Sequence, residues 1–524
     1  MTGTLTLLRA FVRRDRWLYL WWGVGVALLY VSQAWSVDGL YKTQAEFDKA
    51  AASMQGNSAL VAMTGPARAL NTTGGQVTWQ AAAFGVVCAG LMSMFVLGRH
   101  TRAEEETGRD ELLRAAPVGR YAAPTAALLD AMIANVVLGL LVFGSLAAYG
   151  LAVPDSLGLG LGLTVTGWFL TGTALIAMQL TTSTRAAYGL AGAVIAVAYV
   201  LRAIGDVSAP ALSWLSPIGW YQAMHAFSGL RWWPLALPAV GTVVVIAVAR
   251  AVFDRRDFGS GVLPSRPGSA RAGAGLTHGL GLAWRLQRPA FLGWALGLLL
   301  MGLSFGTMGD GVEDIVGDSS YSRDVILQGS NDIVDGFYAT LIVMLALLSA
   351  GFAVSSALRP RGEEDAGRVD SLLATALPRS TWLAGHVVVT AAGTVVILAA
   401  SGLGLGISYA VVTGDGGAVV RLSVPALTFA PAVLVLSGLA RLLYGLAPRA
   451  SVVAWLGVLV AWVVLLFGDV FDLPQWLQGI SPFEHLGLMP LQDFRLAPFL
   501  VLTVLAAALS AAGQVAFRYR DVGL

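Results

Sequence analysis

Twelve long runs of apolar residues constrain the fold of this chain more than any other feature of its sequence. A helix needs about 20 apolar residues to cross roughly 30 Å of hydrocarbon. Charged residues make up only 12% of the 524 residues, whereas soluble domains contain about 25%. We therefore predict an all-α polytopic membrane protein with about twelve transmembrane helices, near residues 17–36, 79–98, 125–153, 157–180, 186–201, 234–253, 291–308, 337–358, 382–412, 422–443, 452–468 and 496–517.

The distribution of basic residues predicts the orientation of these spans. If the amino terminus is cytoplasmic, most of the 33 lysines and arginines fall in segments on the cytoplasmic side. Such an excess is typical of cytoplasmic loops, so both termini are expected in the cytoplasm. The net charge is only +2 and no basic face is interleaved with aromatic residues, so we expect no nucleic-acid partner.

The sequence also contains an internal repeat. The stretch "EEETGRDELLRAAPVGR" at residues 104–120 and the stretch "EEDAGRVDSLLATALPR" at residues 363–379 share acidic residues followed by Gly-Arg. Each lies between the second and third spans of its half, and a Ser-Pro pair at 216–217 or 481–482 precedes the last span. We therefore predict two homologous six-helix halves, residues 1–258 and 278–524, joined by a flexible cytoplasmic linker at 259–277 that is rich in Gly, Ser, Pro and Arg.

The repeated motif is predicted to form a short amphipathic helix in each half. Glu105 precedes Arg109 by four residues, and Glu364 precedes Arg368 by four, which is the favourable order for a helical ion pair. A solvated loop that anchors the span ends is the alternative. Recurrence at the same place in both halves favours a contact surface for a symmetric cytoplasmic partner. The candidate residues are Glu104, Glu105, Gly108, Arg109, Glu111, Leu112, Leu113 and Arg120 in the first motif, and Glu363, Glu364, Gly367, Arg368, Asp370, Leu372, Leu373 and Arg379 in the second.

These motifs give the chain a family resemblance. The stretches "RHTRAEEETGRDELLRAAPVGR", "EEDAGRVDSLLATALPR" and "MTGPARAL", with "GG" before the second span, resemble the ABC-2 type permeases of polyketide-antibiotic (tetronasin-type) exporters. The resemblance covers nearly the whole chain. It implies a bacterial cell-membrane protein in which each half is one ABC-2 (type V exporter-like) transmembrane domain and each motif carries a coupling helix.

The resemblance also implies partners and a further structural element. Two separate cytoplasmic ABC ATPase subunits, expected as a homodimer that holds ATP and magnesium, would dock on the motifs. A helical re-entrant segment is expected before the sixth span of each half, within residues 208–227 and 473–491. The second motif has Leu377 and Pro378 where the first has "PVG", so the two docking sites need not be equally engaged.

The sequence lacks the motifs of a phosphate-binding loop and of a metal site, which limits the functions expected of the chain. A phosphate-binding loop would end in Gly-Lys-Ser or Gly-Lys-Thr, but the only lysines, Lys42 and Lys49, follow Tyr41 and Asp48. The chain itself is therefore expected to hold no nucleotide or other cofactor, and its five histidines have no metal-ligand spacing. Asp130 is the one clear acid within a span, and we interpret it as reaching the cytoplasmic surface or capping packed helices.

These observations predict the permease subunit of an ATP-driven exporter. With little charge in the spans, the substrate is expected to be a small lipophilic or amphiphilic molecule, such as an antibiotic. Candidate residues for a pathway between the halves are Trp168, Phe169, Met178, Trp455 and Trp462. Two alternatives remain open: an ion-coupled secondary multidrug transporter, and a polytopic membrane enzyme.

Overall fold

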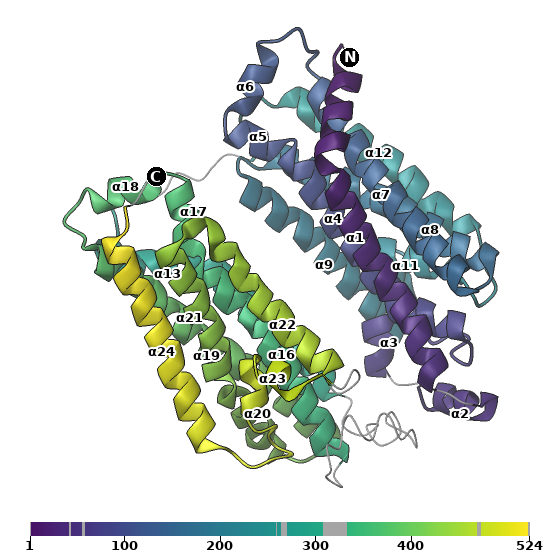
Figure 1. Ribbon diagram of the computed structural model, residues 1–524. Helices are drawn as coiled ribbons and strands as arrows, with labels where there is room; N and C mark the ends of the chain where they lie inside the picture. The colour runs from purple at the N-terminus through teal and green to yellow at the C-terminus, as the bar shows by residue number, and fades with distance from the viewer. Residues whose placement is uncertain are drawn as a thin grey trace. The chain divides into compact units, whose positions relative to one another are not determined.

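In the part of the chain that it describes, the computed structural model consists of helices joined by turns and loops, with no strand (Figure 1). That part comprises residues 2–40, 43–54, 58–257, 259–263, 270–307, 333–468 and 473–521. Within it, twelve helices are long and apolar enough to cross a membrane. These are Thr4–Gly39, Thr73–Glu106, Ala122–Tyr149, Val153–Leu180, Thr184–Val207, Trp233–Arg255, Gly279–Gly306, Val334–Asp365, Arg379–Thr413, Ala418–Leu446, Pro448–Leu465 and Leu496–Tyr519. The prediction of an all-α polytopic membrane protein with twelve spans is confirmed.

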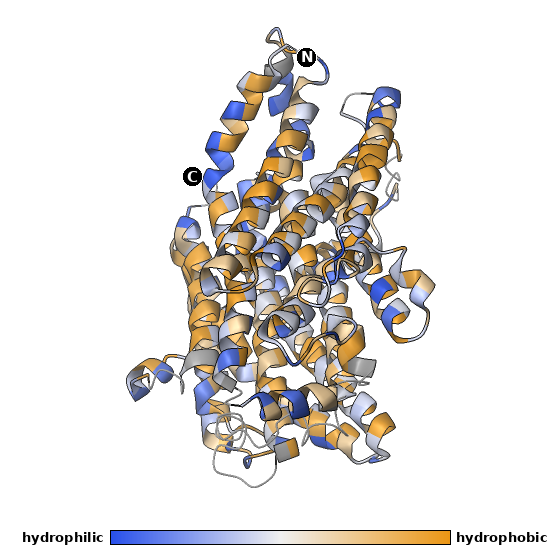
Figure 2. Cartoon of the chain, turned by 90° about the vertical axis from the view of Figure 1, so that its right-hand side faces the viewer, coloured by the Kyte–Doolittle hydropathy of each residue, from blue (hydrophilic) through white to orange (hydrophobic). Residues whose placement is uncertain are grey.

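Apolar surface is carried along the length of these helices. Figure 2 shows hydrophobic residues running along the long helices, with hydrophilic residues gathered towards helix ends and connecting segments. In the last helix, Leu500, Val501 and Val504 are each more than half exposed. Exposed aliphatic rows of this kind suit contact with lipid, where every backbone polar group must be bonded within the helix.

The chain divides into two compact units, Met1–Gly268 and Ser269–Leu524. Each unit contains six of the twelve candidate spans. The boundary between the units falls inside the segment predicted as a linker. The assignment of the two units to duplicated transmembrane domains stays a prediction.

Unit 1 is a bundle in which neighbouring helices approach closely. Its long helices are α1 (Thr4–Leu40), α4 (Thr73–Arg99), α7 (Ala122–Tyr149), α8 (Val153–Leu180), α9 (Thr184–Val207) and α12 (Ala236–Arg255). Helix α7 packs on α1 and α8, and α8 also packs on α12. At the α7–α8 contact, a Cβ on Gly139 would lie 2.4 Å from the carbonyl oxygen of Gly160. Small residues therefore set this helix spacing, as is common in membrane bundles.

Unit 2 uses the same kind of packing between different helices. Its long helices are α13 (Gly279–Gly306), α16 (Ile333–Ala357), α19 (Arg379–Thr413), α20 (Ala418–Thr428), α21 (Ala430–Leu446), α22 (Ala454–Phe467) and α24 (Leu496–Tyr519). Helix α13 packs along α19, and α21 along α24. Gly302 and Gly306 of α13 bring its backbone against that of α19.

Short helices lie where re-entrant segments were expected. In unit 1 these are α10 (Pro210–Ser213) and α11 (Pro217–Gln222), and in unit 2 they are α23 (Gln475–Gln478) and η5 (Pro482–His485). The Tyr221 hydroxyl donates to the Leu159 carbonyl over 3.1 Å, which fixes α11 against α8. Phe483 of η5 is buried and stacks on Phe429.

The first part of the predicted linker is not a free connection. The backbone N–H groups of Val262 and Leu263 donate to the carbonyls of Gln179 and Leu180 at the end of α8. The Ser260 carbonyl accepts hydrogen bonds from Arg102 and Arg256. These bonds hold residues 260–263 against the end of α8, which composition alone does not indicate, and the flexibility of the linker stays a prediction.

The glycine packing in unit 2 yields a stability prediction. A Cβ on Gly302 would lie 2.3 Å from the Ser401 carbonyl oxygen, which is backbone and has to move. Gly302→Ala should therefore lower the stability of the detergent-solubilised protein by about 1–3 kcal/mol, measured as an earlier thermal transition. Gly297→Ala in the same helix is the control, since its Cβ would meet nothing within 4 Å. Equal transitions for the two variants would contradict close packing at Gly302.

Candidate functional site

Each repeated motif folds as two short helices separated by a glycine. In unit 1 these are α5 (Arg102–Glu106) and α6 (Arg109–Arg114), with Gly108 between them at a φ of 73°. In unit 2 they are α17 (Arg359–Asp365) and α18 (Arg368–Leu373), with Gly367 at a φ of 65°. The prediction of one short amphipathic helix per motif was wrong, because the left-handed backbone at each glycine ends the first helix before the arginine.

The second glutamate of each motif binds the end of the last long helix of its own unit. Both carboxylate oxygens of Glu105 accept from the Arg256 guanidinium, one of them over 3.1 Å. In unit 2, the oxygens of Glu364 accept from Arg520 over 2.9 Å and 2.7 Å. Two-point carboxylate–guanidinium pairs of this kind fix orientation as well as distance.

The last arginine of each motif makes a second connection to the same helix end. Arg120 donates to the Phe253 carbonyl over 3.3 Å. Arg379, its counterpart in unit 2, donates to the Arg520 carbonyl over 2.8 Å. Each motif is therefore held at two points against α12 or α24.

The first glutamate of each motif is also engaged. Glu104 pairs with Arg14 of α1 over 3.1 Å. Glu363 is buried and pairs with Arg359 over 2.5 Å and with Arg368 over 2.6 Å. The motif glutamates thus position the segments from within their own units.

The remaining candidate residues lie around the glycine breaks. Arg109 and Glu111 on α6, and Arg368 and Asp370 on α18, are exposed. Leu372 and Leu373 are half-buried, and Leu373 packs beside buried Val369. Leu112 and Leu113 belong to α6, but their side chains lie outside the described part of the structure. Each segment thus has an anchored inner side and an exposed tip.

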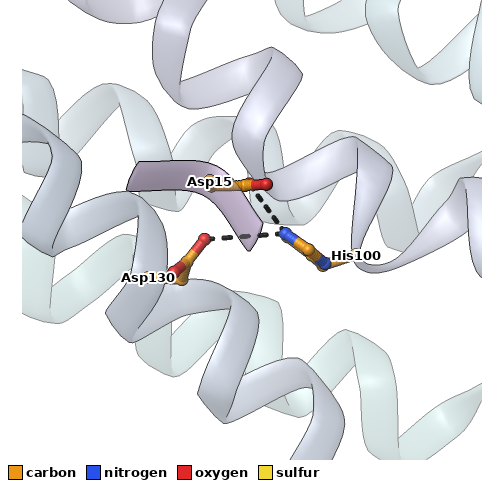
Figure 3. Close-up of side chains that lie close together, drawn as sticks. All are labelled: Asp15, His100 and Asp130. Atoms are coloured by element: carbon orange, nitrogen blue, oxygen red, sulfur yellow. Dashed lines mark hydrogen bonds and ion pairs between the residues drawn. The ribbon is translucent and has the colours of Figure 1, made fainter. Parts of the chain in front are cut away.

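A buried cluster of charged residues in unit 1 was not predicted. Asp15 of α1, His100 at the end of α4 and Asp130 of α7 come together (Figure 3). His100 Nε2 lies 2.7 Å from Asp15 and 3.7 Å from Asp130. The Tyr19 hydroxyl donates to Asp130, and Arg99 pairs with Asp15 over 2.9 Å.

The cluster corrects the interpretation of Asp130. Its side chain does not reach the surface, because Asp130, Asp15 and His100 are all buried. The carboxylate and imidazole atoms lie within 4.8 Å of one another, close enough to hold a cation. Arg99 also pairs with Asp15, so part of the negative charge of the two carboxylates is already offset.

Unit 2 has a neutral polar cluster on its own first three long helices. Gln287 of α13 is 2.9 Å from His386 of α19, and the Ser356 hydroxyl of α16 is 2.7 Å from that of Thr390. All four residues are buried. The units therefore place polar groups on corresponding helices, but only unit 1 places acids in these clusters.

The predicted pathway residues do not form one site within either unit. On α8, Trp168 donates to the Met132 carbonyl over 3.0 Å, Phe169 packs on Trp220, and Met178 is buried. On α22, Trp455 is 40% exposed and Trp462 packs against the core of unit 2. Their role in a pathway stays a prediction.

The anchoring pairs yield a testable prediction. Glu364→Gln should loosen α17 and α18, because Gln cannot form the charged two-point pair with Arg520. We expect the free energy of local opening of this segment to fall by about 1–3 kcal/mol, measured as faster hydrogen–deuterium exchange of peptides from residues 359–377. Exposed Asp370→Asn in the same segment is the control. Unchanged exchange in Glu364→Gln would show that the pair does not hold the segment.

Comparison with known proteins finds a family model and a curated relative. The model described as the C-terminal domain of the multidrug efflux system permease Rv1217c matches residues 276–518. The chain is 38% identical to the multidrug efflux system permease protein Rv1217c of Mycobacterium tuberculosis (strain H37Rv) over an alignment of 531 residues. This alignment covers 99% of the chain and 95% of the relative.

Proposed function

Because this chain belongs to the family of the multidrug efflux system permease Rv1217c, we propose that it is the membrane-spanning permease subunit of an ATP-driven exporter. The observation that carries the proposal is the similarity to a multidrug efflux permease over 99% of the chain. The exported compounds would be lipophilic or amphiphilic, such as antibiotics. The chain would lie in the bacterial cell membrane with both termini in the cytoplasm.

The energy would come from two cytoplasmic ABC ATPase subunits, proposed as a homodimer that holds ATP and magnesium. The chain has no Gly-Lys-Ser or Gly-Lys-Thr loop of its own. The ATPases would dock on the exposed tips at Gly108–Arg109 and Gly367–Arg368. Two anchored segments of similar build in one chain support a partner with two similar surfaces.

The anchors supply a physical route for transmission. In unit 1, α5 is joined to α12 through Glu105–Arg256 and to α1 through Glu104–Arg14. The Thr184 N–H at the start of α9 donates to Glu106 over 2.9 Å. A push on α5 and α6 would therefore reach three long helices through direct contacts and move them as a body.

The apolar character of the spans supports a lipophilic substrate. A hydrophilic solute would need convergent polar groups to replace its water, because burying polar groups without partners is unfavourable. Trp168, Phe169, Met178, Trp455 and Trp462 remain our candidates for the walls of the pathway.

One observation favours a second candidate function, an ion-coupled multidrug transporter. Buried acids within membrane helices commonly mark proton pathways, and Asp15, His100 and Asp130 form such a cluster. The two candidate functions differ in their energy source, so an experiment that supplies either ATP or an ion gradient distinguishes them.

The energy source is tested with proteoliposomes. We expect the permease–ATPase complex to accumulate an amphiphilic fluorescent drug in inside-out vesicles when ATP is added, with no ion gradient imposed. The chain without ATPases, given an imposed proton gradient, is the comparison and should not transport. Gradient-driven transport by the chain alone would replace the ATP-driven proposal with the ion-coupled one.

The docking surface is tested by charge reversal at exposed Arg109. Arg109→Glu should reduce ATPase copurification and drug-stimulated ATP hydrolysis by about tenfold or more, because a like charge would replace an attractive contact at this tip. Arg255→Glu is the matched control, since this arginine is also exposed but lies at the end of α12. An assembled tip variant with normal export would contradict docking at this tip.

A further inference from the structure

A cavity in unit 1 lies at the end of α9 that is far from α5. Helix α9 begins beside Glu106 of α5 and ends at Val207. At that far end, α9, α10, α11 and the turns after α3 (Ser58–Thr64) and before α12 line an open cavity of about 270 Å³. The cavity is large enough for a polar head group but too small to enclose a whole drug-sized molecule.

Guanidinium groups give this cavity a positive wall. Arg68 and Arg231 line it, together with the carboxylate of Asp206. That carboxylate is already engaged, since it accepts from the Ser213 hydroxyl over 2.7 Å and lies 3.6 Å from buried Arg202. With Asp206 offset by Arg202, two positive charges remain at the wall.

The pKa of His225 is lowered in these surroundings. Burial, and after it the guanidiniums of Arg68 and Arg231, lower the pKa of His225 to about 4. The imidazole is therefore neutral near neutral pH, and Asp206, which also lines the cavity, is engaged with Ser213 and Arg202. An anion bound in the cavity would offset the positive charge of Arg68 and Arg231.

The backbone beside the cavity is held in an unfavourable conformation. Ala69, His225 and Phe227 have φ values of 47°, 54° and 58°, in the left-handed region that non-glycine residues rarely occupy. Their turns are fixed by neighbouring bonds, such as the 2.7 Å bond from the Phe227 N–H to Asp155. Such conformations persist where the surrounding structure enforces them, and they gather at binding sites.

An exposed apolar edge adjoins the positive wall. The rings of Trp214 and Trp233 stack with their centroids 5.5 Å apart, and both residues line the cavity. Trp214 is 45% exposed and Trp233 57% exposed, and their neighbour Leu215 is 66% exposed. The surface therefore changes from charged to apolar within a single site.

We propose that this cavity binds the acidic head group of an anionic amphiphile, whose hydrocarbon part lies along Trp214 and Trp233. An anionic membrane phospholipid and a soluble single-chain amphiphile share this chemistry. The site is formed by unit 1 alone and requires no ATPase partner, so its test stands apart from the proposed export function.

The test measures binding to the purified full chain in a neutral detergent by calorimetry. The probes are dioctanoyl phosphatidylglycerol and dodecyl phosphate, with dioctanoyl phosphatidylcholine and inorganic phosphate as comparisons. We expect at least one anionic amphiphile to bind, and both comparison compounds to bind at least about tenfold more weakly. Binding of phosphatidylglycerol alone would identify a membrane lipid, and binding of dodecyl phosphate alone a soluble amphiphile. Equal affinity for phosphatidylcholine, or for inorganic phosphate, would overturn the proposal.

Two substitutions assign the binding to this cavity. Arg231→Gln should weaken binding of the anionic amphiphile about tenfold or more, because it removes a charged donor. Asp206→Asn, in a variant that keeps the wild-type thermal transition, should strengthen it, because it removes the negative charge from the cavity wall. Arg495→Gln, an exposed arginine in unit 2, is the control and should leave affinity unchanged. Wild-type affinity in a folded Arg231→Gln variant would place the ligand elsewhere and reject the site.

Discussion

A carboxylate–guanidinium pair closes each unit by joining the segment between its second and third spans to the end of its last one. Glu105 with Arg256, and Glu364 with Arg520, are two-point pairs in largely buried surroundings. Removing one partner would leave a poorly solvated charge, so such pairs strongly favour one arrangement of the joined elements. The same contact in both units supports the predicted duplication, and it explains why the motif glutamates recur.

The two units nevertheless differ where their first three long helices meet. Unit 1 places Asp15 and Asp130 beside His100, whereas unit 2 places Gln287 and Ser356 on the corresponding helices. In unit 1, Asp15 pairs with Arg99 and contacts His100. Amide and hydroxyl groups in unit 2 need only hydrogen bonds. Similar helices therefore carry clusters of different charge, so the units are not electrostatically equivalent.

The spans could be predicted from the sequence because each membrane span is a run of consecutive apolar residues. The ion pairs that anchor the motifs could not be predicted from such local patterns, since Glu105 and Arg256 are 151 residues apart in sequence. Spacing alone also misjudged each motif, because the i,i+4 rule assumes a continuous helix and Gly108 interrupts it. Asp15 lies before the first predicted span, near residues 17–36, so its contact with the Asp130 cluster could not be foreseen. Residue types were predictable, but their long-range partners were not.

The placement of charge in unit 1 bears on how an exporter of this kind would be driven. An ion carrier needs a carboxylate that exchanges its partner ion during transport. Both oxygens of Asp15 are occupied, by Arg99 and His100, and Tyr19 donates to one oxygen of Asp130. These bonds tie α1, α4 and α7 together, which favours a structural role. Exposed charge lies instead at the tips of α6 and α18, on segments that are fixed to the ends of long helices. Force applied at those tips would pass into the bundle through the anchoring pairs, which is the arrangement that an external motor requires.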